Sequence, residues 1–286
     1  MGLEEKTEKL LERLKSLGSA VIGYSGGVDS AVLCMAAFRA LGSDRMLACL
    51  ADGPSLPASE KISALEVANQ AGFPVRTYSG TEMENPAYVK NGSDRCFHCK
   101  GDLFFHLRRI ASEKGFEHCL YGANADDLSD FRPGHRAAGE NGVWAPLAEA
   151  GLNKGDIRNL ARKWNLSCHD KPANPCLSSR IPYGEEVLPE RLKQIEAAED
   201  ILREKGFREF RVRWNFGAAQ LEVGRDELFR LSDQNLREEL IRRLTLLGFT
   251  RVTVDPEGFQ SGKLNHALSP AEKQLAMTAS LLLSPP

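Results

Sequence analysis

The fold is decided by residues 20–30, which have the sequence AVIGYSGGVDS. The apolar run at 20–24 predicts a buried β-strand, and helically spaced apolar residues resume at Ala31 and continue to Leu41. A glycine-rich turn between such a strand and helix exposes backbone N–H groups at a helix N-terminus, where an anion binds favourably. The pattern predicts a phosphate-binding loop; a capped glycine turn without a ligand is the alternative. The candidate ligands are Ser25, Gly26, Gly27, Asp29 and Ser30.

This loop differs from the phosphate loop of kinases and GTPases, because no Lys-Ser or Lys-Thr pair follows its glycines. Asp29 beside phosphates is explained if a metal ion bridges them. A second polar turn, YGANADD at 121–127, follows an expected strand. Asp126 and Asp127 in this turn are suited to Mg²⁺, which prefers carboxylate oxygen. An Asx-rich surface turn is the alternative interpretation.

Strand and helix patterns alternate through the first part of the chain. Strands are expected at 20–24, 46–51, 74–78 and 117–122, and helices at 3–17, 31–41, 58–71 and 98–114. The alternation predicts an α/β domain over residues 1–168, a doubly wound parallel sheet covered by helices on both faces. Ligands of such sheets bind at the carboxyl ends of the strands.

The rest of the chain predicts a second, smaller domain. Residues 169–189 contain four prolines, so we expect a catalytic loop and linker rather than one regular element. An α+β substrate-binding domain over 190–268 follows, with helices at 190–205 and 235–247 and strands at 210–215, 220–224 and 250–254. The tail, 269–286, adds a helix or frays.

Composition excludes several functional classes. The chain has 286 residues, 42% of them hydrophobic, so it can bury a core without disulfides. Its net charge of −2 argues against a bulk nucleic-acid coat protein. The longest apolar run, Ala31–Phe38, is too short to span a bilayer, so no membrane partner is expected. Seven cysteines, an odd number, without an export signal indicate a reducing cytoplasm.

The SGGxDS string in this context resembles the pyrophosphate loop of the N-type ATP pyrophosphatases, the PP-loop superfamily. That superfamily includes GMP synthetase, NAD synthetase, argininosuccinate synthetase and several thiolation enzymes. The resemblance implies cleavage of ATP between its α- and β-phosphates to adenylate a carbonyl or carboxylate oxygen. It also implies that the turn at 121–127 is the second nucleotide-binding turn, with Asn124 and Asp127 as ATP ligands.

Three further strings resemble the LarE-type sulfur transferases: DFRPG at 130–134, NPCLSSRIPYG at 174–184 and VDPEGFQSGKLN at 254–265. This resemblance extends from the glycine loop to about Asn265. It implies ATP-dependent activation of a carboxylate of pyridinium-3,5-biscarboxylic acid mononucleotide and its conversion to a thiocarboxylate. That chemistry helps to build the nickel-pincer nucleotide of lactate racemase. A homo-oligomer is also implied, whereas the sulfur donor is not specified.

Cysteines supply the soft nucleophile that such chemistry needs. Cys176 lies in a loop near Arg180, and neighbouring cations favour a thiolate. In the simplest family members the matching cysteine is sacrificed, leaving dehydroalanine. Here Cys96 and Cys99 form a CxxC, and with Cys176 they resemble the three ligands of a [4Fe–4S] cluster whose fourth iron carries hydrosulfide. Zinc with His98, a redox dithiol, and a sacrificial Cys176 without a cofactor are the alternatives.

The second domain supplies candidate substrate ligands. Arg211 and Arg213 alternate in a strand and share one face, where two guanidinium groups repel unless an anion lies between them. The resemblance implies that they, with Arg180, bind the substrate phosphate, and that Glu199 is a catalytic carboxylate near the reacting groups. A solvated strand face and a solvated helix charge are the alternatives. Glu222 is a weaker candidate.

Three other functions remain to be distinguished. A cluster-dependent tRNA thiolase would need a basic surface, and nucleic acid is therefore not an expected partner. An amide ligase of the NAD or GMP type would need an ammonia source, and the sequence has no glutaminase segment. A non-catalytic nucleotide-binding regulator is the remaining class.

Overall fold

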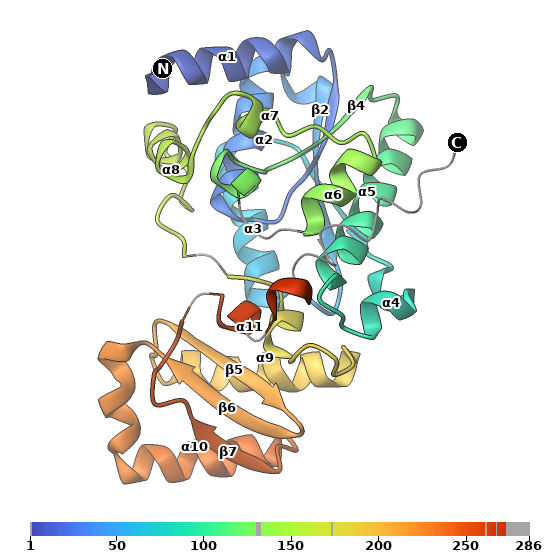
Figure 1. The fold of residues 1–286 in the computed structure, drawn as a ribbon. Helices are drawn as coiled ribbons and strands as arrows, with labels where there is room; N and C mark the ends of the chain where they lie inside the picture. The colour runs from blue at the N-terminus through green and yellow to red at the C-terminus, as the bar shows by residue number, and fades with distance from the viewer. Residues whose placement is uncertain (1, 130–132, 173, 261, 267, 273–286) are drawn as a thin grey trace.

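The computed structural model describes residues 2–129, 133–172, 174–260, 262–266 and 268–272. The chain forms two lobes, each with its own sheet (Figure 1). The first sheet is parallel throughout and has the strand order β3-β2-β1-β4. This confirms the predicted α/β class. Its strands are β1 (Ala20–Gly23), β2 (Met46–Asp52), β3 (Val75–Ser79) and β4 (His118–Tyr121).

Alternate residues of these strands enter two different cores, one on each face of the sheet. Ile22 and Ala48 belong to one apolar cluster, whereas their neighbours Val21 and Cys49 belong to another. Because successive strand side chains point to opposite faces, both faces need covering helices. The first core is covered by α1 (Leu3–Ser16), α2 (Val28–Leu41), α3 (Ala58–Ala71) and α8 (Lys154–Lys163), and the second by α5 (Arg95–Lys114) and α6 (Pro133–Glu140).

The second lobe is an α+β layer. Strand β5 (Phe210–Asn215) pairs antiparallel with β6 (Ala218–Val223), which pairs parallel with β7 (Arg251–Val254). One face of this sheet packs on α9 (Pro189–Glu204) and α10 (Gln234–Leu246), through residues such as Val212 and Leu221. The other face carries Arg211, Arg213 and Glu222 and is polar. Short elements complete the chain: helices α4 (Pro86–Val89), α7 (Pro146–Glu149) and α11 (Lys263–His266), and 3₁₀ turns at Ser43–Arg45, Glu82–Glu84, Asp126–Ser129, Leu177–Arg180 and Arg225–Ser232.

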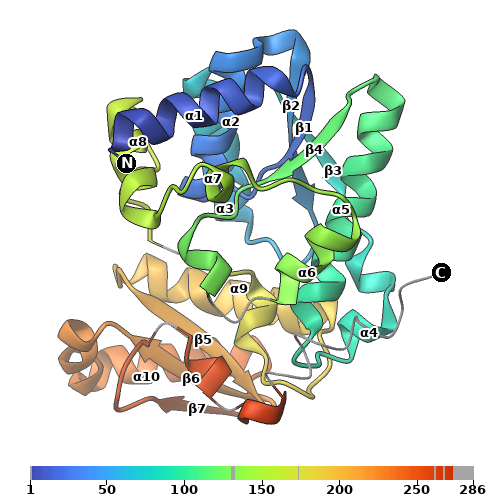
Figure 2. The same ribbon diagram turned by 45° about the horizontal axis from the view of Figure 1, so that its top comes forward.

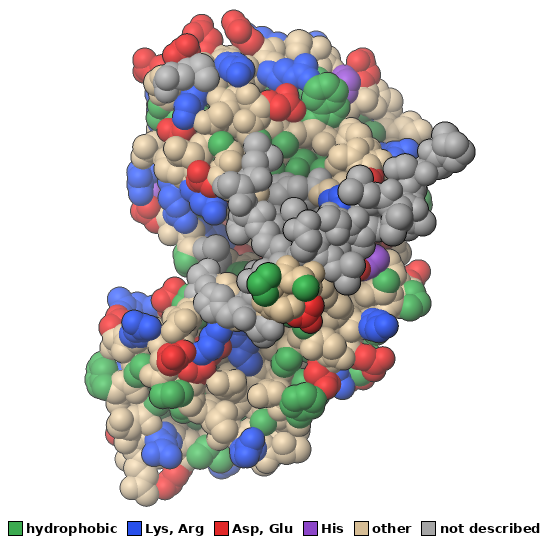
Figure 3. All heavy atoms as spheres, in the orientation of Figure 1, with side chains coloured by type: hydrophobic (Ala, Val, Ile, Leu, Met, Phe, Trp, Pro, Cys, Tyr) green, Lys and Arg blue, Asp and Glu red, His purple; other side chains and the backbone are tan. Residues whose placement is uncertain are grey.

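The proline-rich segment crosses from the first lobe to the second, as Figures 1 and 2 show. One predicted boundary near it is wrong: α5 begins at Arg95 rather than at residue 98, so both cysteines of the CxxC lie in its first turns. Acidic and basic side chains are interspersed over the face seen in Figure 3. None of the described helices combines the length and the apolar character that crossing a bilayer would require.

Candidate active site

The glycine loop follows β1 and ends where α2 begins, at the carboxyl edge of the sheet. Gly26 has a φ of +75°, and a Cβ there would lie 2.6 Å from the Cβ of Ala64, so only glycine fits. The Ser30 hydroxyl donates to the Gly27 carbonyl at 3.0 Å and accepts from the Ser25 N–H at 3.2 Å. Ser30 therefore holds the loop closed, whereas Ser25 is exposed and is positioned to meet a ligand.

The second predicted nucleotide turn lies directly against this loop. A Cβ on Gly122 would lie 2.9 Å from the backbone nitrogen of Ser30, so glycine permits the close approach. The Asn124 amide donates to the Asp29 carboxylate at 3.3 Å. Asn124 and Asp127 also exchange backbone-to-side-chain hydrogen bonds of 3.2 and 3.0 Å. The structure thus brings Asp29, Asn124 and Asp127 together at one edge.

Asp126 contacts the start of helix α8. Its carboxylate accepts the backbone N–H of Lys154 at 2.9 Å, at the start of α8. It thus satisfies one of the N–H groups that a helix start leaves without a helical partner. This contact gives Asp126 a structural role, and its role as a magnesium ligand stays a prediction. Asp29, the carboxylate in the glycine loop itself, is the better candidate.

The loop that carries Cys176 is anchored to α4 and α5 by three buried polar side chains. The amide of Asn91 donates to the carbonyls of Pro182 and Glu185, both at 2.7 Å. Arg95 donates to the Ser178 carbonyl at 2.9 Å and to the Asn91 side chain at 2.5 Å. In addition, the Tyr88 and Ser178 hydroxyls lie 2.6 Å apart. Since Arg95 directly precedes Cys96, these contacts hold the CxxC turn and the Cys176 loop side by side.

The three predicted thiols consequently share one environment. Burial, with the nearby Cys176 and Cys96 thiols, raises the pKa of Cys99. Cys96 and Cys99, three residues apart on a helix, lie on the same face. His98 lies between them in sequence and points elsewhere, with Nε2 3.2 Å from the Asp94 carboxylate. Among the described residues, no three Cys, His, Asp or Glu side chains form a preformed metal site. The donor set nevertheless suits a thiophilic metal or cluster.

The Cys176 loop also contacts the carboxyl edge of the first sheet. Leu177 donates its N–H to the Ser55 carbonyl at 2.8 Å, just beyond the end of β2. The Asn174 amide donates to Glu60 on α3 at 2.8 Å, and Gly26 of the glycine loop packs on the same helix. The thiols therefore lie at the edge of the sheet where the nucleotide loops lie.

Arg180 and Glu199 form a fully buried ion pair, which changes their predicted roles. Nε and Nη2 of Arg180 donate to the two carboxylate oxygens of Glu199 at 2.8 and 3.0 Å. Its remaining N–H groups point at Pro175, Cys176, Ser179 and Asn174. Glu199 also accepts the Val212 N–H at 3.2 Å. Because all five Arg180 donors have protein partners, we revise Arg180 from a phosphate ligand, and Glu199 from a catalytic carboxylate, to positioning residues of the loop.

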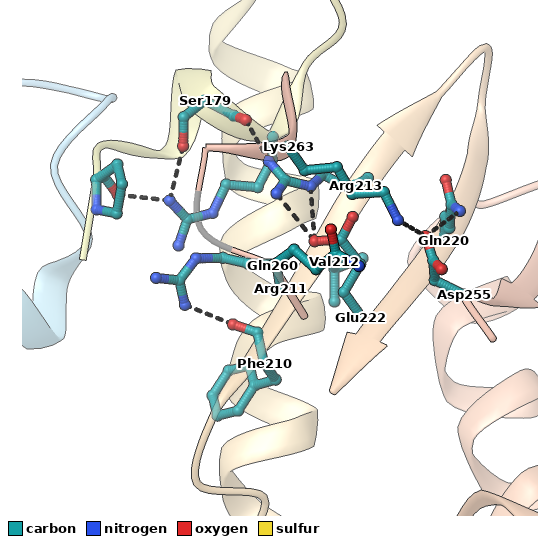
Figure 4. A network of polar contacts seen from close by, with 12 residues as sticks. Ser179, Phe210, Arg211, Val212, Arg213, Gln220, Glu222, Asp255, Gln260 and Lys263 are labelled. Carbon is teal, nitrogen blue, oxygen red and sulfur yellow. Dashed lines mark hydrogen bonds and ion pairs between the residues drawn. The ribbon is translucent and has the colours of Figure 1, made fainter. Parts of the chain in front are cut away.

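The polar face of the second sheet holds the other predicted arginines (Figure 4). Arg213 donates to Glu222 at 2.9 and 3.0 Å and to the Ser179 carbonyl at 2.6 Å, so it too supports the loop. Burial and the nearby guanidinium of Arg180 lower the pKa of Arg211 to about 10. Arg211 thus lies beside two other guanidinium groups, an environment that favours an anion. It remains the best of the three candidates for the substrate phosphate.

Several site residues were not identified from the sequence. Asn91, Arg95 and Tyr88 belong to none of the motifs. Asn91 has a φ of +57°, a conformation that asparagine adopts more readily than most residues and that is typical of a turn. Lys263 pairs with Asp255 and lies in the string at 254–265, whose residues had no predicted roles. The string at 130–134 cannot be compared with its prediction, because residues 130–132 lie outside the described residues.

A glycine loop without lysine, at the carboxyl edge of a parallel sheet and next to the loop that carries Cys176, is typical of an ATP-utilising sulfurtransferase of the PP-loop type. Comparisons with known proteins agree. The NAD synthase family model matches residues 3–91. One component of the glutamine-hydrolysing GMP synthase of Archaeoglobus fulgidus is 26% identical over 71% of this chain and 70% of its own.

Two relatives match almost throughout. The uncharacterized protein slr1717 of Synechocystis is 39% identical over 93% of this chain and 99% of its own. The pyridinium-3,5-bisthiocarboxylic acid mononucleotide synthase of Lactiplantibacillus plantarum is 32% identical over 94% of this chain and 97% of its own. The chain belongs to the family of this synthase, the LarE family, which confirms the resemblance inferred from the motifs.

Proposed function

We propose that this enzyme adenylates a carboxylate of pyridinium-3,5-biscarboxylic acid mononucleotide and replaces one of its oxygens with sulfur. The product, a thiocarboxylate, belongs to nickel-pincer nucleotide synthesis and lactate racemase maturation. The loop that carries Cys176 is held against the CxxC turn and lies at the edge of the sheet that carries the glycine loop, and this is the observation on which the proposal rests. The name of the Lactiplantibacillus relative supports the choice of substrate.

The first step is adenylation. A carboxylate oxygen attacks the α-phosphorus of ATP, the α–β anhydride bond breaks, and pyrophosphate leaves with the electron pair. Backbone N–H groups of the glycine loop and the N-terminus of α2 meet the growing negative charge. Asp29, whose carboxylate accepts a hydrogen bond from Asn124, would hold a Mg²⁺ ion, which when bound would neutralise part of the phosphate charge.

The second step transfers sulfur. A sulfur nucleophile attacks the acyl carbon, the bond to the AMP oxygen breaks, and AMP leaves with that electron pair. Cys96, Cys99 and Cys176 would hold a [4Fe–4S] cluster, which when bound would supply an iron atom without a protein ligand for inorganic hydrosulfide. Asn91 and Arg95 keep the Cys176 loop against the CxxC turn.

The sacrificial route remains the alternative. There the Cys176 thiolate attacks the acyl adenylate and forms a thioester. Loss of a Cα proton then breaks the Cβ–S bond, so the product keeps the sulfur and residue 176 becomes dehydroalanine. This route needs no metal, and it allows one turnover per chain.

The test is anaerobic purification with iron and sulfide analysis, followed by turnover with ATP, the biscarboxylic substrate and sodium sulfide. We expect AMP, pyrophosphate and thiocarboxylate in equal amounts; ADP and phosphate would refute the function. Cys99→Ser should lose iron and multiple turnover, whereas the matched control Cys168→Ser, at a buried cysteine of the first core, should keep both. Iron-free enzyme that turns over once and loses hydrogen sulfide from its mass would establish the sacrificial route.

The tRNA thiolase alternative is tested in the same preparation. Tight binding of tRNA at low salt, with sulfur appearing in the RNA and none in the pyridinium substrate, would replace the proposed substrate. We expect no sulfur in the RNA, because charges of both signs are interspersed on the face in Figure 3.

A further inference from the structure

One buried positive charge beside the CxxC has no negatively charged side chain to balance it. Arg95 is the first residue of α5 and directly precedes Cys96. It is only 3% exposed. Among the residues that the structure describes, no aspartate or glutamate lies within ion-pair distance of its guanidinium. The adjacent Asp94 carboxylate instead lies 3.2 Å from His98.

The contacts that hold the Arg95 guanidinium are neutral. Its Nη1 donates to the Asn91 side-chain oxygen at 2.5 Å and to the Ser178 carbonyl at 2.9 Å. The centre of the Tyr183 ring lies 5.6 Å from the guanidinium carbon. These contacts satisfy hydrogen bonds and fix the side chain, but they leave a full unit of charge without a counter-charge, and such burial is costly.

The other arginines of the site show what is missing. Arg180 is paired with Glu199 at 2.8 Å, and Arg213 with Glu222 at 2.9 Å. Both lie close to the Cys176 loop, as Arg95 does, and each has a carboxylate of its own. An arginine cannot avoid the cost by releasing its proton, because it stays charged at every relevant pH. The charge of Arg95 must therefore be balanced by a group other than a carboxylate of the described residues.

Sulfur is the nearest source of negative charge. Cys96 follows Arg95 in the chain, and Ser178, which accepts a hydrogen bond from Arg95, lies two residues after Cys176. Burial by itself lowers the pKa of Arg95, but the neighbouring Cys96 and Cys176 groups raise this pKa above its ordinary value. Three thiolates carry more negative charge than a divalent metal ion removes, so a centre built from them is an anion.

We propose that Arg95 is the counter-charge of a thiolate centre formed by Cys96, Cys99 and Cys176, and that its positive charge is matched by the thiolates when they bind a metal or cluster. Arginine suits this position because its charge is permanent and its planar group is held by Asn91. The inference rests on the proposed sulfur chemistry. It gives Arg95 an electrostatic role in addition to its anchoring of the Cys176 loop.

The test measures Co²⁺ binding to the full chain, prepared free of iron under anaerobic, reducing conditions. Absorption from sulfur-to-cobalt charge transfer reports the metal bound by thiolates. Arg95→Gln removes the charge and keeps a side chain that can donate to a carbonyl. It should weaken Co²⁺ binding by about tenfold or more, because opposite charges attract strongly where water is largely excluded. Arg95→Lys keeps the charge and should recover most of the affinity.

Tyr88→Phe is the matched control for the anchoring role. It removes a hydroxyl that lies 2.6 Å from the Ser178 hydroxyl, in the same loop, and it changes no charge. Its Co²⁺ affinity should fall much less than that of Arg95→Gln. If Arg95 were only an anchor, Arg95→Lys and Tyr88→Phe would weaken Co²⁺ binding as much as Arg95→Gln does, and that pattern would overturn the inference.

Two further measurements respond to the charge itself. Co²⁺ should raise the urea midpoint of unfolding more in the wild type than in Arg95→Gln, because the ligand stabilises the chain that binds it more tightly. In iron-loaded enzyme, Arg95→Gln should make one-electron reduction about tenfold less favourable, a potential lower by about 59 mV. Equal midpoint shifts or an unchanged potential would contradict the inference.

The outcomes separate this inference from the proposed function. Wild-type enzyme whose Co²⁺ binding depends on Arg95, but which forms ADP from ATP, would keep the inference and refute the proposed function. A wild type without thiolate-bound Co²⁺ would overturn the inference, whereas the release of AMP and pyrophosphate would still be decided by its own assay.

Discussion

Removing the Asn91 amide should separate the two half-reactions. Asn91 is fully buried, and its amide makes two 2.7 Å hydrogen bonds to the Cys176 loop and accepts one from Arg95. Losing a buried hydrogen bond and leaving its partner unsatisfied costs about 1–3 kcal/mol. Because three such bonds share one side chain and partial relaxation is expected, we predict that Asn91→Ala lowers the unfolding free energy by about 2–4 kcal/mol.

A matched variant isolates the hydrogen bonds from the backbone. Asn91 has a φ of +57°, which costs alanine about 1 kcal/mol and glycine almost nothing. Glycine, however, loses more conformational entropy on folding, by a similar amount. We therefore expect Asn91→Gly and Asn91→Ala to be destabilised about equally, because the lost amide dominates both. Urea unfolding followed by tryptophan fluorescence measures the two values.

The functional consequence follows from what Asn91 contacts. Its side chain holds the loop that carries Cys176, through hydrogen bonds to Pro182, Glu185 and Arg95 rather than to the glycine loop. At a temperature where the variants remain folded, ATP–pyrophosphate exchange dependent on the acid substrate should persist near the wild-type rate. Thiocarboxylate formation should fall by about tenfold or more, as expected when a reacting group is misplaced by about 1 Å. Equal losses in both assays, or a glycine variant as stable as the wild type, would refute the reasoning.

Three other variants test the site and the fold. Gly122→Ala forces a Cβ to within 2.9 Å of the start of α2, so ATP should bind at least about tenfold more weakly by calorimetry. Glu199→Gln leaves Arg180 buried without its counter-charge and should cost about 3–5 kcal/mol in urea unfolding; a stable but inactive variant would instead restore a catalytic role. The hydrogen bond from Lys6 lowers the pKa of Asp156 in the folded protein. This contact therefore stabilises the fold above the pKa of Asp156 in the unfolded chain, near 4, and the stabilisation is lost as pH falls through the lower pKa of the folded protein. Lys6→Met should therefore remove about 1 kcal/mol at neutral pH and much less in acid, measured as the difference in unfolding free energy from the wild type.

The sequence alone located the strand and the helix that flank the glycine loop, and it predicted that this loop binds phosphate. Strand alternation and helix spacing are local, so β1, α2 and the glycine turn between them could be located from about twenty residues. The sequence also identified the cysteines, since CxxC and the Cys176 string are short and specific. It began the helix at residue 98 because polar residues surround the CxxC, whereas contacts with Asn91 and the Cys176 loop let α5 begin at Arg95.

What each charged side chain does was decided by tertiary structure. The neighbours of Arg180 and Lys171 come from segments that no local pattern relates to them. Arg180 forms an ion pair with Glu199 on α9. Lys171 forms an ion pair with Glu60 on α3 and contacts the glycine loop. The local sequence around an arginine does not show whether its side chain lies next to a reactive cysteine or in a buried ion pair. The partner within hydrogen-bond distance distinguishes them, because a buried charge without one is costly, and only the folded chain brings that partner into place.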